Sequence, residues 1–200
     1  MCDIYLMRHG RTAMDVLKRS DGWLDLPLSD KGRMGLIPAQ QHLKLEPINA
    51  IHAAPLRRTQ ETAHIMASGI VKCPTTFSCP EAMTWNLGVN AGLPKEEAKP
   101  KVKELLAHPD TSPIGGESYN EFKKRFMAWF KARVKECKAK GKPCLIVCSG
   151  SNLRLLGTVL CKNRDEFNLD EGGLVKLRQI DGKWHAQTLI GDGADPEEIS

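Results

Sequence analysis

Residues 4–10 read IYLMRHG, so that a short apolar run is followed at once by Arg8, His9 and Gly10. A buried strand that ends in a tight turn points its last side chains into the crevice where open α/β sheets bind ligands. An arginine presents a planar fork of donors that matches phosphate oxygens, a neutral imidazole can attack phosphorus, and a glycine lets the backbone approach a ligand closely. The three residues together indicate a phosphate site, although a lone tripeptide of this kind is explained more readily by chance.

The composition is that of an ordinary globular protein, because 41% of the 200 residues are hydrophobic and 26% are charged. This length is enough for a sizeable core, and we expect a single domain over 1–200 that ends in a flexible acidic tail at 191–200. The N-terminus has no long apolar core, and no later window approaches the roughly 20 apolar residues needed to span a bilayer. We therefore expect a soluble cytoplasmic protein with no membrane partner.

The charge and the cysteines exclude further classes of protein. The net charge of +5 is mild; it favours anionic ligands in general and does not indicate nucleic acid. Lysines over 95–103 and 131–142 fall at helical spacing among apolar residues, which favours solvated helix faces. The seven cysteines are scattered and form no Cys-x-x-Cys pair, so neither a zinc site nor a disulfide framework is indicated. We expect no metal and no cofactor.

Apolar periodicity predicts strands that alternate with helices. Besides the first strand at 4–7, apolar runs and an Asp-Gly turn at 181–182 predict strands over 48–53, 71–77, 143–148, 174–177 and 184–189, the last two as a hairpin. Three- and four-residue spacing predicts helices over 56–68, 96–107, 118–139 and 152–160. Another helix begins near Ser29 and is kinked or restarted at Pro38. This alternation predicts an α/β fold, a three-layer α/β/α sandwich with a mainly parallel sheet.

Four segments in chain order strengthen the indication of a phosphate site. They are Arg-His-Gly-Arg-Thr at 8–12, Gly-x-x-Asp-x-Pro-Leu-Ser-x-x-Gly at 22–32, Ala-Pro-Leu-Arg-Arg-Thr-x-Glu-Thr-Ala at 54–63, and Gly-Gly-Glu-Ser at 115–118 with Arg125 downstream. With these segments the chain resembles the histidine phosphatase superfamily, the phosphoglycerate mutase-like proteins. The resemblance runs from residue 4 to about residue 160, and chance agreement at all these spacings is implausible.

The resemblance implies roles for three residues. His9 matches the phosphate-accepting histidine of the family, and Arg8 matches the arginine beside it that binds phosphoryl oxygens. Arg58 matches a second arginine clamp at the start of a helix; its neighbour Arg57 is the alternative, and the spacing favours Arg58. Two guanidinium groups at one dianion would hold charge while the phosphoryl group moves from a substrate oxygen to nitrogen.

The first departure from the family pattern is at the strand end over 143–148. Family members carry Val-x-His-Gly-x-x-x-Arg there, and this chain has Val-Cys-Ser-Gly-Ser-Asn-Leu-Arg at 147–154, so that Ser149 replaces the second histidine. Ser149 and Gly150 are still expected to contact the phosphate. A serine supplies no imidazolium, and losing one such donor typically costs on the order of 100- to 1000-fold in rate. Asp15 stands where many members carry asparagine; because a carboxylate repels phosphate, we expect it to cap a helix or lie at the surface.

The second departure concerns the proton donor to the leaving group. In the family this donor is often a glutamate four residues before a glycine, and here Thr84 stands four residues before Gly88. Glu81 lies nearby but off register and is the candidate donor, with Asp25 as a more remote alternative.

Three functions fit these residues. The first is a phosphatase that hydrolyses a phosphoric monoester or a phosphoramidate through a phosphohistidine on His9, weakened by Ser149. The second is a phosphate-binding pseudo-enzyme that is weak or inactive, and the third is a phosphotransferase of the phosphoglycerate mutase type, less favoured because 81–117 offers no clear carboxylate clamp. The retained nucleophile favours the phosphatase. The expected partner is a small phosphorylated molecule or a phosphoprotein.

Overall fold

A six-stranded sheet forms the centre of the molecule. The computed structural model describes residues 2–161 and 165–191, and the sheet has the order β3-β2-β4-β1-β5-β6. The four strands β3, β2, β4 and β1 pair in parallel, whereas β5 pairs antiparallel with β1 and with β6. The strands are β1 (Ile4–Arg8), β2 (Ala50–Ala53), β3 (Thr75–Ser78), β4 (Cys144–Cys148), β5 (Leu174–Ile180) and β6 (Lys183–Ile190).

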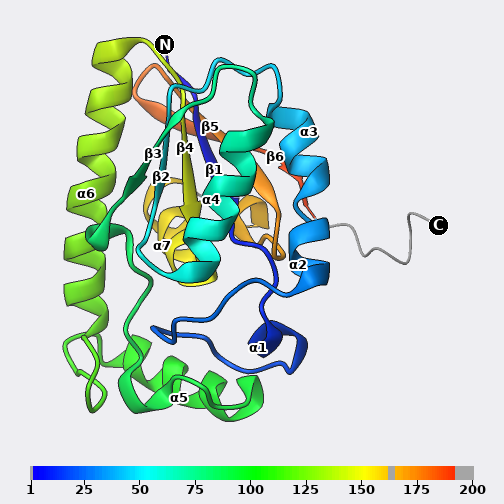
Figure 1. The fold of residues 1–200 in the computed structure, drawn as a ribbon. Coiled ribbons are helices and arrows are strands. Elements are labelled where there is room, and N and C mark those ends of the chain that lie inside the picture. Colours follow the sequence, from blue (N-terminus) through cyan, green and yellow to red (C-terminus); the bar gives the residue numbers. More distant parts are fainter. Residues whose placement is uncertain (1, 162–164, 192–200) are drawn as a thin grey trace.

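Helices cover both faces of this sheet (Figure 1). The α-helices are α1 (Ala13–Val16), α2 (Asp30–Met34), α3 (Ile37–Leu43), α4 (Arg57–Gly69), α5 (Lys95–Ala107), α6 (Tyr119–Lys140) and α7 (Gly150–Leu160), with short 3₁₀ turns η1 (Pro80–Ala82), η2 (Gly88–Asn90) and η3 (Asp165–Phe167). Helices α3 and α4 lie on one face, and α6 and α7 lie on the other. The predicted three-layer α/β/α sandwich with a mainly parallel sheet is confirmed.

The first strand shows how the sequence builds two cores. Side chains alternate between the faces of a strand, and in β1 all of the apolar side chains are buried because both faces are covered. Ile4 and Leu6 belong to the cluster that contains the aromatic residues of α6. Tyr5 and Met7 belong to the cluster that contains the buried apolar residues of α3 and α4.

Most predicted elements are present, and a few have different boundaries. The helix expected near Ser29 is two short helices: Ser29 caps α2, and α3 restarts with Pro38 in its first turn. The strand expected over 71–77 is only Thr75–Ser78, because the chain turns at Cys73 with a φ of 43°. Helix α4 spans Arg57–Gly69, one residue later at each end than expected. The tail expected over 191–200 lies, apart from Gly191, outside the described residues.

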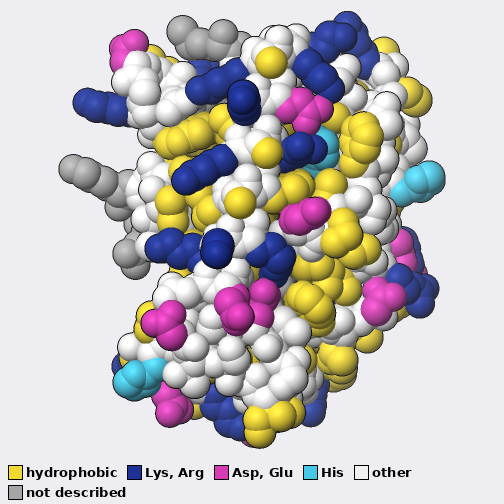
Figure 2. Space-filling view, turned by 90° about the vertical axis from the view of Figure 1, so that its left-hand side faces the viewer, with side chains coloured by type: hydrophobic (Ala, Val, Ile, Leu, Met, Phe, Trp, Pro, Cys, Tyr) yellow, Lys and Arg dark blue, Asp and Glu magenta, His cyan; other side chains and the backbone are white. Residues whose placement is uncertain are grey.

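The two lysine-rich stretches lie in different surroundings. Lys131, Lys135 and Lys138 are exposed, and Figure 2 shows Lys and Arg side chains gathered along the outer face of α6, as the sequence predicts. Three of the four lysines of α5, Lys95, Lys99 and Lys103, line the cleft at the strand ends. Among the described residues, no helix combines the length and the apolar character that crossing a membrane requires.

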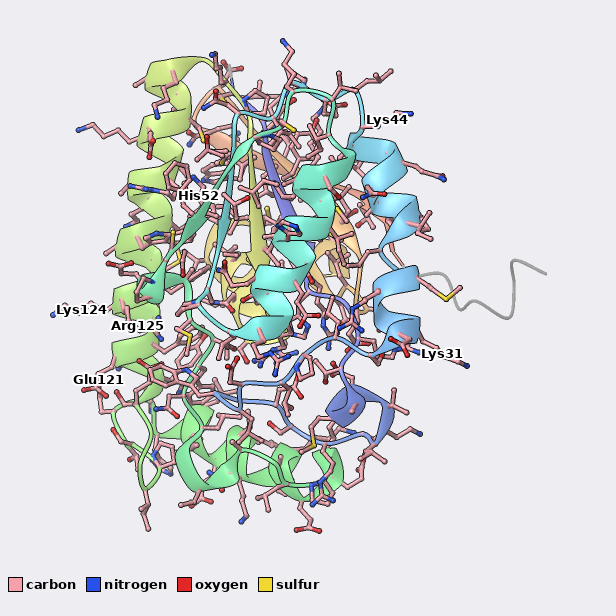
Figure 3. The ribbon with its side chains drawn as sticks, in the orientation of Figure 1. Lys31, Lys44, His52, Glu121, Lys124 and Arg125 are labelled. Atoms are coloured by element: carbon pink, nitrogen blue, oxygen red, sulfur yellow. The ribbon has the colours of Figure 1, made fainter. Side chains whose placement is uncertain are left out.

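His52, on β2, is buried between the sheet and α6 (Figure 3). Its ring stacks on Phe77 at 5.2 Å and meets Trp129 edge-on at 6.1 Å. Burial, followed by the nearby charge of Arg133, lowers the pKa of His52 from 6.5 to about 4, against the opposing effect of Glu136. The unfolded chain therefore takes up a proton at a pH where the folded protein does not.

This depressed pKa predicts a loss of stability in acid. The contribution of His52 is complete above pH 6.5 and is lost as the pH falls toward about 4. Between pH 7 and pH 5 we expect the free energy of unfolding to fall by on the order of 2 kcal/mol because of this residue. Urea denaturation at both pH values measures this fall. In His52→Phe the free energy of unfolding should fall less than in the wild type, by a difference of on the order of 2 kcal/mol. Equal losses in the two proteins would contradict the assignment.

Candidate active site

The site lies at the carboxyl ends of β1 and β4, between the sheet and α5 (Figure 1). Arg8 and Cys148 are partners in the parallel ladder, and the backbone N–H of His9 donates to the Cys148 carbonyl at 3.0 Å. The next residues of the two strands, His9 and Ser149, are therefore brought together. Gly10 is required beside them, because a Cβ at this position would lie 2.8 Å from the Gly32 carbonyl oxygen.

The imidazole of His9 is held in one tautomer. Nδ1 lies 2.9 Å from the Gly10 carbonyl, which can only accept, so Nδ1 carries the proton. Nε2 then has a free lone pair and accepts from Nε–H of Arg58 at 3.3 Å. Burial, followed by the positive charges of Arg58 and Arg8, lowers the pKa of His9 to about 3 against the effect of Asp15. At neutral pH the ring is uncharged, which is the state a nucleophile requires.

The structure places Arg58 at this histidine and leaves Arg57 outside. Arg58 is completely buried, whereas the side chain of Arg57 is 59% exposed. The two terminal nitrogens of Arg58, Nη1 and Nη2, donate to the carbonyls of Leu24 and Gly22, each at 2.7 Å. Arg58 thus anchors the loop over the site and presents Nε–H to the imidazole.

This double role predicts a large effect on stability. Arg58→Ala leaves the part-buried carbonyls of Leu24 and Gly22 without this donor, and Asp21 loses a cation at 3.6 Å. We expect the free energy of unfolding to fall by about 3 kcal/mol, measured by urea denaturation. The matched variant Arg57→Ala removes an exposed guanidinium and should change it by less than about 0.5 kcal/mol. Similar losses in both variants would show that burial of Arg58 is not what matters.

Arg8, the second predicted phosphate ligand, already has protein partners. Its Nη1 donates to the Leu169 carbonyl at 2.7 Å, and its Nη2 is ion-paired with the carboxylate of Glu171, which also lies 3.6 Å from Arg11. Nε of Arg8 is buried and has no hydrogen-bond partner within residues 2–161 and 165–191. A phosphate that reaches Arg8 must share this guanidinium with Glu171, a residue that the sequence analysis did not single out.

Two carboxylates, Asp15 and Asp21, also line the site. Asp15 closes a capping box at α1, because it accepts from the Thr12 N–H at 3.1 Å and its own N–H donates to the Thr12 hydroxyl at 3.2 Å. The predicted capping role of Asp15 is confirmed. The hydroxyl of Thr12 also lies 3.2 Å from Asp21, which the sequence analysis missed.

The two residues considered as proton donors, Glu81 and Asp25, do not line the site. The Glu81 side chain is exposed on η1 and does not line the cleft. Arg125, near the lower end of α6 in Figure 3, holds this segment by donating to the backbone carbonyls of Glu81 and Met83, at 2.8 Å and 3.0 Å. Asp25 is also outside the cleft lining and accepts from the Arg57 N–H at 2.6 Å. The prediction that Glu81 supplies the proton is therefore not supported by its position.

The segment that carries Thr84 is buttressed from α6. Glu117 pairs with Arg125 at 2.6 Å, and Ser118 caps α6. The carbonyl of Thr84 accepts from Nε1 of Trp23 at 2.8 Å, and the buried Thr84 lines the cleft. The Gly-Gly-Glu-Ser motif thus supports the wall of the site and contributes no carboxylate to it.

A cleft of about 940 Å³ opens at these strand ends. Ser149 and Gly150 line it at the N-terminus of α7, where helix N–H groups favour anions. In the described part of the chain, two carboxylates, Asp15 and Asp21, line the cleft, whereas seven cationic side chains do so: Arg8, Arg19, Arg58, Lys95, Lys99, Lys103 and Arg154. This excess of positive charge fits an anionic ligand.

These features are those of one family. A model of the histidine phosphatase superfamily, branch 1, matches residues 4–190. The chain belongs to this superfamily, and the resemblance seen in the sequence is confirmed.

Individual relatives differ in what they are named for. The chain is 28% identical over 175 residues to a 2,3-bisphosphoglycerate-dependent phosphoglycerate mutase of Rhodopseudomonas palustris (strain BisB18), covering 80% of this chain and 81% of the relative. It is 27% identical over 205 residues to a metal-independent phosphoserine phosphatase of Arabidopsis thaliana, covering 99% and 83%. Among solved structures, Bacillus stearothermophilus YhfR superposes with a TM-score of 0.77 at 24% identity, covering 96% of this chain and 98% of that one. The last comparison shows a shared fold.

Proposed function

We propose that the protein is a phosphatase that hydrolyses a phosphorylated substrate through a phosphohistidine on His9. The observation that carries this proposal is the fixed tautomer of His9, whose neutral ring presents Nε2 beside Arg58. Nε2 attacks phosphorus, the bond to the leaving oxygen breaks, and water then releases the phosphoryl group from the imidazole. The arginines and the N-terminus of α7 hold the charge of the moving group, and this chemistry requires no metal.

The cleft supports an anionic substrate of moderate size. Its lining carries seven cations and two carboxylates, and α5 supplies three of these cations along one face, Lys95, Lys99 and Lys103. We propose a small phosphorylated molecule or a phosphoprotein segment as the substrate, and a cytoplasmic location. The relatives named as a phosphoserine phosphatase and as a phosphoglycerate mutase act on small phosphorylated acids by their names, which is compatible with this choice.

A phosphate-binding pseudo-enzyme is the second candidate, and three observations favour it. Ser149 stands where the family carries its second histidine. Thr84 stands where family members often carry the glutamate that donates a proton to the leaving group. Glu171 occupies the guanidinium of Arg8. Each of these reduces the stabilisation that the site can give to a transferring phosphoryl group.

Intact-mass measurement after incubation with an aryl phosphate separates the two candidates. We expect the wild type to gain the mass of one phosphoryl group and to release inorganic phosphate. Binding of inorganic phosphate with neither an adduct nor turnover would favour the pseudo-enzyme. Transfer of the group to a second phosphorylated acid, without release of phosphate, would favour the phosphotransferase.

A further inference from the structure

A cleft that performs phosphoryl transfer needs a proton donor for the leaving oxygen, and the usual place for it is taken by Thr84. Of the carboxylates in the described residues, only Asp15 and Asp21 line the cleft. The other two candidates from the sequence, Glu81 and Asp25, do not. The donor must therefore be sought between Asp15 and Asp21.

The contacts of the two carboxylates differ in a way that favours Asp21. Asp15 is committed to the α1 cap and lies 3.5 Å from the Lys95 ammonium and 4.0 Å from Arg8. Asp21 has no role in a helix cap; its carboxylate lies 3.6 Å from Nε of Arg58, and that same Nε lies 3.3 Å from Nε2 of His9. Asp21 is thus one guanidinium away from the nitrogen that takes up the phosphoryl group.

The electrostatic surroundings separate the two acids further. Burial raises the pKa of Asp21 to about 6, and the negative charge of Asp15 also raises this pKa. Arg58, the Thr12 hydroxyl and Lys95 act in the opposite direction. Burial also acts on Asp15, but the interactions with His9, the Thr12 N–H, Arg8 and Lys95 lower the pKa of Asp15 overall. Two neighbouring carboxyl groups with separated pKa values are the arrangement by which enzymes assign an acid and a permanent anion.

We propose that Asp21 is the catalytic proton donor and acceptor of this site, a role that rests on the proposed phosphatase function. When the P–O bond breaks, its electron pair stays on the leaving oxygen, which takes the proton from the Asp21 carboxyl, while Nε2 of His9 bonds to phosphorus. In the second half, a water oxygen bonds to phosphorus, the P–N bond breaks with its electron pair returning to Nε2, and the Asp21 carboxylate takes the water proton. The carboxyl group is regenerated and one phosphate is released.

A leaving-group comparison tests this role. Phosphoserine releases an alkoxide, which must be protonated, whereas 4-nitrophenyl phosphate releases a phenolate stable enough to depart alone. We expect Asp21→Asn to lower kcat on phosphoserine by roughly 100-fold and to change the departure of nitrophenolate, measured as the pre-steady-state burst, by only about 2-fold. The wild-type kcat on phosphoserine should fall as the pH rises above about 6, and Asp21→Asn should lose this dependence.

Asp25→Asn and Glu81→Gln are the matched controls, because they make the same chemical change outside the cleft. Both should keep the wild-type ratio between the two esters. If Asp21→Asn slowed the reaction of both esters equally, the proposal would be overturned, and Asp21 would only support Arg58. If Glu81→Gln lowered kcat on phosphoserine alone, Glu81 would be the proton donor instead. Absence of any His9 adduct in the wild type would overturn the phosphatase function itself, and with it the role of Asp21.

Discussion

His9→Ala should abolish the phosphoryl adduct and lower kcat on 4-nitrophenyl phosphate by on the order of 10⁵-fold or more, as is typical when a covalent nucleophile is removed. The reason is that no second nucleophile stands at this position. Nε2 of His9 is the atom that faces Arg58, and the neighbouring strand end offers Ser149, whose hydroxyl is uncharged. Intact-mass measurement and phosphate release assays measure the two effects.

The variant His9→Gln provides the control for packing. Its amide can still accept from Arg58 and fill the buried site, so that its fold is preserved, but it cannot form a phosphohistidine. Both variants should therefore be inactive, with Gln closer to the wild type in thermal stability. If either variant still became phosphorylated, the nucleophile would have to be another residue.

The fold could be predicted from the sequence because its signals are local. The apolar run at 4–7, the helical spacing of the Phe residues over 122–130 and the Asp-Gly turn at 181–182 each determine one element without reference to the rest. The strand expected over 71–77 was too long because apolar character extends into a turn, where tertiary contacts decide the backbone.

The centre of the site could also be predicted, because strand ends converge. His9 and Ser149 each follow a buried strand, and the pairing of β1 with β4 brings them together. The structure agrees with the preference for Arg58 over Arg57. Neighbouring residues on a helix point in different directions, so only one of the two arginines on α4 can face the sheet edge.

The partners of the arginines could not be predicted. Glu171 pairs with Arg8 across 163 residues of chain, and nothing in either segment marks the pair. Asp21 lies in a loop whose path is set by the bonds between Arg58 and two backbone carbonyls. The lysines of α5 show helical spacing, but spacing does not tell whether a helix face meets solvent or a cleft.

Ser149→His should raise turnover of 4-nitrophenyl phosphate by about 100-fold, the effect usually produced by one charge-stabilising donor. Ser149 is the first residue after β4, it lines the cleft, and the strand pairing puts it beside His9. An imidazole there would lie next to a phosphoryl group on His9.

Position, rather than the mere addition of a histidine, should account for this gain. Ser151 lines the same cleft two residues further along α7, so Ser151→His adds an identical ring at the same helix end. We expect no comparable gain from Ser151→His, because the ring would not be held next to His9. The steady-state kcat of the two variants and of the wild type decides the matter.

The outcome also bears on why the chain lacks this histidine. A gain of the expected size means that Arg8, His9 and Arg58 form a working phosphoryl-transfer site whose rate is limited by a single missing donor. An unchanged or lower rate means that Ser149 does not stand in the second histidine's place. In that case the ion pair between Arg8 and Glu171 becomes the next feature to alter, since it withholds a cation from the same phosphoryl group.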